Sequence, residues 1–251
     1  MSQSPPIENY NLMWFRSDLR VFDNPALFSA MSQGPTIAVY MITEGQWREH
    51  GISPAKRALI IRQVKALHDE LEKLHVPLLV LSADTFNAIP KVFNQFLQKI
   101  PVKKVFFNHE YEVNEQACAK QVMESLALLD IICSTYHDAC IIEPGLIRNK
   151  QNKPYKVYSA FKRAYIQSFA YHARSILNRP EAQRPIRVNA DLSLVPSDID
   201  LLAEFPTRLP LQAPPLPELP AQLPSEPASV PELPASAAFE LPELPGPATP
   251  V

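Results

Sequence analysis

The sequence predicts an α/β protein built on a doubly wound, five-stranded parallel sheet, and two observations indicate this fold class. Five short runs rich in Val, Ile, Leu, Phe and Tyr recur between residues 10 and 137, and helical patterns separate them. The runs are apolar almost throughout, which is typical of strands that are covered on both faces. Strands that alternate with helices join by right-handed crossovers, so the sheet is expected to be parallel.

The first run, residues 12–15, breaks into a charged loop and then a helix expected over 24–33. Four charged side chains alternate in sign between positions 16 and 23, so we expect the loop to pair its own charges. Asn24 suits the N-cap of the helix. Pro25 suits the first turn, where its missing N–H would have no partner in any case.

The clearest helix is expected over residues 54–75, where apolar side chains recur at intervals of four and three. Ser53 and Pro54 supply its cap and its first turn. The remaining elements alternate along the chain, with strands at 36–42, 76–82, 102–108 and 131–136 and helices at 88–99 and 113–129.

Composition changes along the chain and predicts four parts: an α/β domain at 1–140, a basic aromatic segment at 141–180, a linker at 181–208 and a Pro-rich tail at 209–251. The basic aromatic segment includes a helix expected over 159–176. In the tail Pro recurs every few residues and Pro-Glu-Leu-Pro occurs three times. Such spacing forbids helices and central strands, so we expect a disordered tail with polyproline II character.

The charge differs between the two parts of the chain, and the cysteines indicate the cellular compartment. Residues 1–180 carry 21 Lys and Arg against 16 Asp and Glu, whereas residues 181–251 carry 3 against 10. The three cysteines form no C-x-x-C pair, which predicts free thiols in a reducing, cytoplasmic compartment and no metal site. No apolar run approaches the roughly 20 residues of a membrane span, and the N-terminus lacks a signal-peptide pattern.

Several enzyme classes are excluded by missing motifs. The sequence contains no G-x-G-x-x-G, no Walker A motif and no G-x-S-x-G elbow. It contains only five Gly, too few and too scattered for a Gly-rich phosphate loop. These absences argue against a nicotinamide-dependent dehydrogenase, a P-loop NTPase and an α/β hydrolase.

Polar runs follow three of the expected strands, at 46–50, 108–115 and 137–138. Ligands of doubly wound sheets bind at the carboxyl ends of the strands, so we expect the three runs to converge as one rim. A second interpretation stays open. Glu112 or Asn114 could cap the following helix, and Glu115 could complement the helix dipole.

Four segments together resemble the DNA photolyase/cryptochrome family. They are W-F-R-x-D-L-R-x-x-D-N-x-A-L at 14–27, Q-W-x-x-H at 46–50, Y-E-V-N-E at 111–115 and Y-K-V-Y-S-A-F at 155–161. The resemblance covers roughly residues 10–180, in order and with the spacing of the family. It is closest to bacterial class I cyclobutane pyrimidine dimer photolyases of the folate type.

The resemblance implies a fold, a cofactor and a site. In that family an N-terminal α/β domain holds a light-harvesting folate, 5,10-methenyltetrahydrofolate, and the positions here that match its contacts are His50, Asn114 and Glu115. The family's FAD and most of its DNA-binding surface belong to a separate helical domain. The implied function is deoxyribodipyrimidine photolyase activity, the light-dependent repair of damaged DNA.

The resemblance implies that this chain carries the antenna domain alone, without the C-terminal FAD-binding helical domain, as the product of a truncated or frameshifted gene. We therefore expect weak folate binding, no FAD binding, little or no binding of damaged DNA and no catalytic residue. The basic aromatic segment is expected to dock onto the helical domain. Two alternatives remain: a cryptochrome-like light sensor, and an α/β nucleotide-binding module with a Pro-rich interaction tail.

Overall fold

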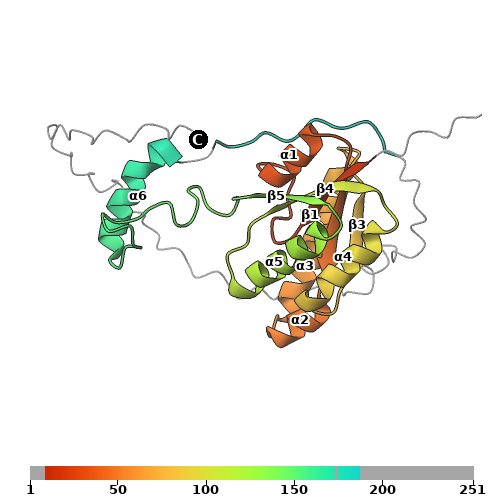
Figure 1. Cartoon of the computed structure of the whole chain (residues 1–251), viewed down its shortest axis with the longest axis horizontal. Helices are drawn as coiled ribbons and strands as arrows, with labels where there is room; N and C mark the ends of the chain where they lie inside the picture. Colours follow the sequence, from red (N-terminus) through yellow and green to blue (C-terminus); the bar gives the residue numbers. More distant parts are fainter. Residues whose placement is uncertain (1–8, 173–174, 187–251) are drawn as a thin grey trace, which may run out of the picture. The chain divides into compact units, whose positions relative to one another are not determined.

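The computed structural model describes residues 9–172 and 175–186 of the 251-residue chain (Figure 1). The predicted Pro-rich tail at 209–251 lies outside the described residues, as does the predicted linker from residue 187 onwards. Within the described part, no helix is both long enough and apolar enough to cross a membrane. The three cysteines of this part are all free thiols, as the sequence predicted.

Five parallel strands form one sheet in the spatial order β3-β2-β1-β4-β5, which confirms the predicted fold class. The strands are β1 (Tyr10–Phe15), β2 (Thr36–Ile42), β3 (Leu78–Ser82), β4 (Val102–Asn108) and β5 (Ile132–Tyr136). Every residue of β1 and β2 is buried, because helices cover both faces of the sheet. The chain order reverses between β1 and β4, so the topological switch point lies at their carboxyl ends.

The helices described are α1 (Pro25–Ser32), α2 (Glu44–Glu49), α3 (Pro54–Glu72), α4 (Ile89–Leu97), α5 (Val113–Ala127) and α6 (Tyr158–His172), with a 3₁₀ turn at Phe86–Ala88. Both predicted caps are confirmed. The Asn24 side chain accepts from the backbone N–H of Leu27 at 3.0 Å, and Ser53 accepts from that of Lys56 at 3.2 Å. Each cap satisfies a donor that the first helical turn leaves without a partner.

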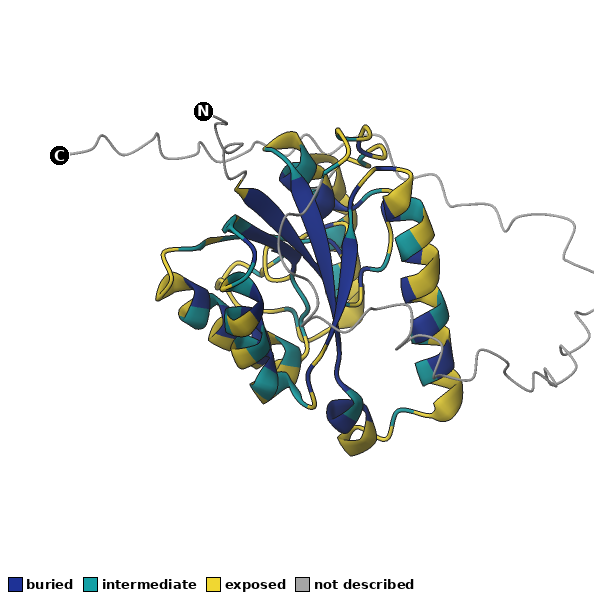
Figure 2. Ribbon diagram, turned by 90° about the vertical axis from the view of Figure 1, so that its right-hand side faces the viewer, coloured by how far each residue is buried: buried dark blue, intermediate teal, exposed yellow. Residues whose placement is uncertain are grey.

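Two apolar layers hold the domain together, one on each face of the sheet. Side chains of α1 and α3, such as Leu27 and Ile61, pack on one face, and side chains of α4 and α5, such as Phe93 and Val122, pack on the other. Figure 2 shows the central strands buried along their length, with helices buried on the side that faces the sheet and exposed on the other. This pattern explains why the strands read as continuous apolar runs and the helices as periodic ones.

The structure moves several predicted boundaries by one to three residues, most of all at the end of α3, and it adds one helix. Helix α3 ends at Glu72 rather than at 75, because His75 adopts a left-handed backbone with φ 57° and Val76 N–H returns to the carbonyl of Leu71 at 3.0 Å. Strand β3 consequently begins at Leu78. Helix α2 was not predicted, since six residues are too few for a periodic apolar pattern.

Residues 177–186, here called the strap, run from the loop between β1 and α1 to the amino-terminal end of β2. Leu177 exchanges two hydrogen bonds with Asp23, at 2.9 and 3.1 Å. Arg179 pairs with Glu70 at 2.8 Å. The amide of Gln183 bonds both backbone groups of Thr36, at 2.9 and 2.8 Å, and also the His75 carbonyl at 2.8 Å. The start of the predicted linker therefore contacts the α/β domain.

Helix α6 carries a ladder of aromatic rings. Phe161, Tyr165 and Phe169 recur at intervals of four residues, and their successive ring centroids are 5.8 and 6.4 Å apart. Tyr158 and Ile166 are largely exposed on the same helix. The sequence predicted a helix over 159–176, and the described helix covers most of that range.

Candidate functional site

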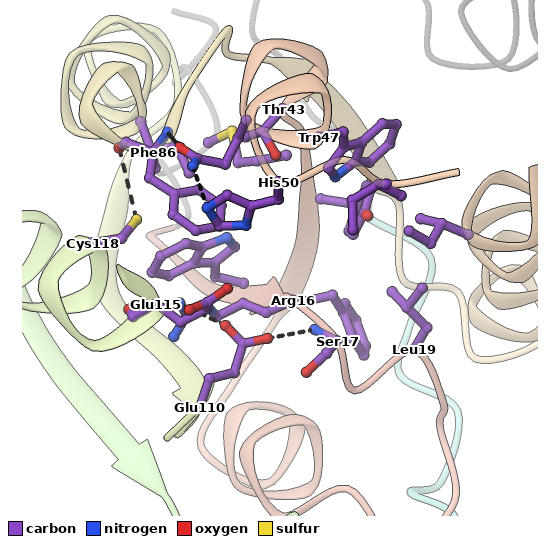
Figure 3. A pocket seen from close by; sticks show the side chains of 18 of the residues that line it. Arg16, Ser17, Leu19, Thr43, Trp47, His50, Phe86, Glu110, Glu115 and Cys118 are labelled. Carbon is purple, nitrogen blue, oxygen red and sulfur yellow. Dashed lines mark hydrogen bonds and ion pairs between the residues drawn. The ribbon is translucent and has the colours of Figure 1, made fainter. Parts of the chain in front are cut away.

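A cavity of about 330 Å³ opens at the carboxyl ends of the strands, beside the switch point of the sheet (Figure 3). Residues from β1 and its loop, from α2 and from the first turn of α5 line it. Its walls are largely apolar and include the aromatic side chains of Trp14, Trp47 and Phe86. A pocket of this size, apolar with a few polar groups, has the composition of a small-molecule site.

Arg16 is the buried cation of the cavity. Its guanidinium lies 4.8 Å from the ring centroid of Trp14, pairs with Glu110 at 2.6 Å and donates to the backbone carbonyl of Glu115 at 2.9 Å. Only 6% of the Arg16 side chain is exposed. Its Nη1 atom is nevertheless buried without a hydrogen-bond partner among the described residues. A ligand with an acceptor atom would satisfy that donor.

The Arg16–Glu110 pair balances two opposed effects. Burial raises the pKa of Glu110, and the neighbouring Arg16 charge acts in the opposite direction. The backbone N–H of Ser17 also donates to the Glu110 carboxylate, at 3.1 Å. Because the pair is removed from solvent, breaking it would leave a buried charge without compensation.

The predicted residues His50 and Asn114 meet at the rim of this cavity. His50 follows α2 as its C-cap, and Asn114 lies in the first turn of α5. Asn114 Nδ2 lies 3.2 Å from His50 Nε2, and Gln46 Nε2 lies 2.8 Å from the same nitrogen. His50 and Glu115 both line the cavity. Three residues that were selected on sequence motifs are therefore neighbours in space.

The alternative interpretation of this run as helix caps receives little support. Glu112 occupies the N-cap position of α5, but its side chain makes no capping hydrogen bond. Its carboxylate accepts from the backbone N–H of Tyr111 at 3.1 Å instead. The Asn114 side chain is directed to His50 rather than to its own helix. Glu115 does lie in the first helical turn, where a carboxylate complements the dipole.

A second polar network fastens the loop between β1 and α1. The buried Asp18 carboxylate accepts from Asn108 at 2.6 Å, from Asn24 at 3.0 Å and from the backbone N–H of Arg16 at 2.8 Å. Burial raises the pKa of Asp18, and these hydrogen bonds act in the opposite direction. The network joins β1, α1 and β4 at the switch point and gives the cavity a rigid edge.

The prediction that this loop pairs its own charges is wrong. Arg16 reaches Glu110 beyond β4, and Arg20 reaches Asp138 beyond β5 at 2.5 Å. Alternating charges within a loop show that the loop needs partners, but they do not show where the partners lie. The neighbouring loops are closer to these side chains because the parallel strands all end at one edge.

The prediction of a single rim is also only partly right. The third polar run, residues 137–138, belongs to a separate cluster. In that cluster the rings of His137 and His109 stack, with their centroids 4.5 Å apart. The Tyr111 hydroxyl is 2.8 Å from His137 Nδ1, and Glu143 is 2.9 Å from His137 Nε2. Desolvation lowers the pKa of His109, and the neighbouring His137 lowers it further. No group of three or more potential metal ligands was found in the described residues.

Three contributors to the cavity were missed from sequence: the Arg16–Glu110 pair, Gln46 as a partner of His50, and Phe86 as a wall. Phe86 forms an edge-on contact with the His50 ring, with centroids 6.2 Å apart. Gln46 had a signal, since it lies four residues before His50 and residues at that spacing share a helix face. That signal required recognition of helix α2.

Comparison with known proteins places the chain in a family. A family model described as DNA photolyase matches residues 11–183, well over half of the chain. The chain belongs to the DNA photolyase family. The matched residues include the sheet except Tyr10, the cavity and most of the strap.

Curated relatives agree with this assignment. The deoxyribodipyrimidine photo-lyase of Vibrio cholerae is 37% identical over 159 residues, which cover 63% of this chain and 34% of the relative. That of Escherichia coli K12 is 33% identical over 189 residues, covering 74% of this chain and 38% of the relative. The chain thus spans little more than a third of the length of these relatives.

Solved structures show the same fold. A cryptochrome of Synechocystis superposes with a TM-score of 0.60 at 20% identity, over 77% of this chain and 41% of that protein. An archaeal photolyase of Sulfolobus tokodaii, solved with two FAD molecules, superposes with a TM-score of 0.59 at 20% identity. The superposed part covers 80% of this chain and 42% of the archaeal protein.

Proposed function

We propose that this chain is the light-harvesting part of a deoxyribodipyrimidine photo-lyase and that it binds 5,10-methenyltetrahydrofolate at the rim of the cavity. The whole protein would repair damaged DNA by a light-driven reaction. The contact between His50 and Asn114, with Glu115 beside them, is the observation that supports the proposal best. It unites the positions that match the folate contacts of the family.

The residues present suit a flat, polar-edged ring. Trp14, Trp47 and Phe86 offer apolar walls, on which an aromatic ring system can pack. The Glu115 carboxylate can accept hydrogen bonds from amino and ring N–H groups. The buried Nη1 of Arg16 could donate to an acceptor atom of the ring. These three kinds of contact match the chemistry of a pterin.

When bound, the folate would absorb light and pass the energy on to a flavin. The chain itself would bind the folate, orient its ring and shield one face of it from water. We infer that the exposed apolar and aromatic side chains of α6 and the basic residues before the helix form the docking surface for a flavin-binding domain. The exposed side chains are Tyr158, Ile166, Phe169 and Tyr171. An exposed apolar surface of this kind indicates a protein partner.

Two observations favour a photolyase over a cryptochrome. The curated relatives cited above are photo-lyases, at 33 and 37% identity. The likeness to a cryptochrome, at 20% identity, is one of fold. Both kinds of protein could use the same antenna domain, so the proposed folate site does not depend on this choice.

A fluorescence titration of the chain with 5,10-methenyltetrahydrofolate tests the proposal. We expect weak binding that Glu115→Ala abolishes or weakens at least about tenfold, because a hydrogen bond to a charged group contributes roughly 1.5–3 kcal/mol. Glu112→Ala is the matched control, since Glu112 lies three residues earlier and its side chain makes no capping bond. Equal binding by Glu115→Ala and the native chain would refute the site. Absence of binding by the native chain would refute folate binding.

A further inference from the structure

The orientation of the Gln46 side chain is fixed by a backbone group. The Phe86 backbone N–H lies 3.1 Å from Oε1 of Gln46. A backbone N–H can only donate, so the atom that faces it must be the amide oxygen. Gln46 is only 9% exposed. Its backbone is also anchored, because its backbone N–H donates to the backbone carbonyl of Asp84 at 3.0 Å. Its side-chain nitrogen is therefore the atom that faces His50.

Helix α2 can hold Gln46 there because Gly45 precedes it. A Cβ atom at position 45 would lie 2.3 Å from Oδ1 of Asp84 and 2.8 Å from its backbone carbonyl. A larger residue would thus push α2 away from the loop that follows β3. The close approach lets Gln46 span the gap between that loop and the ring of His50.

The proton of His50 follows from this geometry. Gln46 Nε2 donates to His50 Nε2 at 2.8 Å, and Asn114 Nδ2 approaches the same nitrogen at 3.2 Å. Two amide donors that face one ring nitrogen require that nitrogen to accept. Neutral imidazole then carries its proton on Nδ1. Glu49 accepts from the second proton of Gln46 Nε2 at 3.4 Å, which is consistent with the same amide orientation.

We propose that Gln46 is a positioning residue that holds His50 in its neutral Nδ1–H form. The site would then select a ligand with a hydrogen-bond acceptor, a carbonyl oxygen or an unprotonated ring nitrogen, opposite His50. Nδ1 makes no hydrogen bond to any described residue, so this donor is available. The role in ligand selection rests on the proposed folate site, whereas the position of the proton does not.

Nitrogen NMR of the histidine rings tests the proton position without any ligand. The native chain is expected to show the Nδ1–H form of His50, identified among the six histidines by its loss in His50→Gln. In Gln46→Glu one carboxylate oxygen still accepts from Phe86 N–H and the other now accepts from the ring. The proton should therefore move to Nε2. Gln63→Glu, which adds the same charge to the cavity lining, should leave the His50 signal unchanged.

A native Nε2–H form would overturn the proposal, as would a Gln46→Glu signal identical to that of the native chain. If Gln46→Glu fails to fold, Gln46→Met removes the donor at similar volume and should shift His50 towards the Nε2–H form that free imidazole side chains prefer. An unchanged His50 signal in Gln46→Met would also overturn the proposal.

The ligand half of the proposal is tested by titration with 5,10-methenyltetrahydrofolate. Gln46→Glu should bind about tenfold more weakly than Gln63→Glu, since it turns the Nδ1 donor of His50 into an acceptor. Equal affinities would overturn the role in ligand selection. A native chain that binds no folate but shows the Nδ1–H form would refute the folate site and leave the assignment of the proton intact.

Discussion

The two edges of the sheet satisfy their polar groups in different ways. At the amino edge the strap supplies partners directly: Gln183 bonds both backbone groups of the fully buried Thr36, and Arg179 pairs with Glu70. Oδ1 of Asn11 is buried there without a partner among the described residues. At the carboxyl edge Arg16 is buried with its Nη1 donor unpartnered among the described residues, beside a cavity.

This difference separates stability from binding. A buried polar group that has all its partners stabilises the fold. One that lacks a partner lowers stability and, where it lies beside a cavity as Arg16 does, can bind another molecule. Substitutions at the amino edge should therefore change the free energy of unfolding and leave ligand binding intact. Substitutions of cavity side chains that make no hydrogen bond within the protein should do the opposite.

The largest loss of stability is expected for Gln183→Ala. It leaves the N–H and carbonyl of Thr36 buried without partners, which should lower the free energy of unfolding by about 3 kcal/mol. Urea denaturation measures the change. Gln95→Ala, on the exposed face of α4, is the control and should stay within about 0.5 kcal/mol. A comparable loss of stability in both variants would contradict the claim that the hydrogen bonds of Gln183 stabilise the fold.

A smaller loss is expected for Asp18→Asn, at the carboxyl edge. The two carboxylate oxygens accept from different donors, so either orientation of an amide sets its NH₂ group against a donor. We expect a decrease of about 2 kcal/mol in the free energy of unfolding. Asp69→Asn, which changes an exposed carboxylate on α3, should cost far less. If Asp18→Asn is as stable as the native chain, the hydrogen bonds to the Asp18 carboxylate do not stabilise the fold.

Glu115→Ala should have the opposite effects to Gln183→Ala, with a loss of folate binding and little change in stability. No hydrogen bond of its carboxylate to a described residue is found, so the free energy of unfolding should change by less than about 0.5 kcal/mol. The same variant should lose folate binding, as proposed above. Measuring both properties in Glu115→Ala and in Gln183→Ala gives a direct test, because the comparison predicts opposite outcomes for the two variants. A large stability loss in Glu115→Ala would contradict it.

The smallest effect is expected from pH. Burial, followed by the nearby His137, lowers the pKa of His109 below its usual 6.5, so the unfolded chain binds the proton more readily. The stability that this provides is present above about pH 6.5 and is lost as pH falls through the lower folded pKa. Urea unfolding at about pH 7.5 and 5.5 should show a smaller loss in His109→Gln than in the native chain. His68→Gln, on α3, should keep the native difference.

Local features of the fold were well predicted from sequence. The bounds of β2 and β4 and the caps at Asn24 and Ser53 agree with the structure, because each depends on residues only a few positions apart. The end of α3 was missed by three residues. The helix ends because His75 adopts a left-handed backbone conformation. Gly at this position would have predicted such a turn from the sequence, whereas His does not.

The candidate site divides in the same way. Sequence motifs selected His50, Asn114 and Glu115. Only folding brings Nδ2 of Asn114 to within 3.2 Å of Nε2 of His50, which lies 64 positions earlier in the chain. The proton on His50, the partner of Arg16 and the course of the strap each depend on groups from other elements. Periodicity and caps are local and can be read along the chain. Partners across a parallel sheet depend on strand order, which the tertiary structure alone decides.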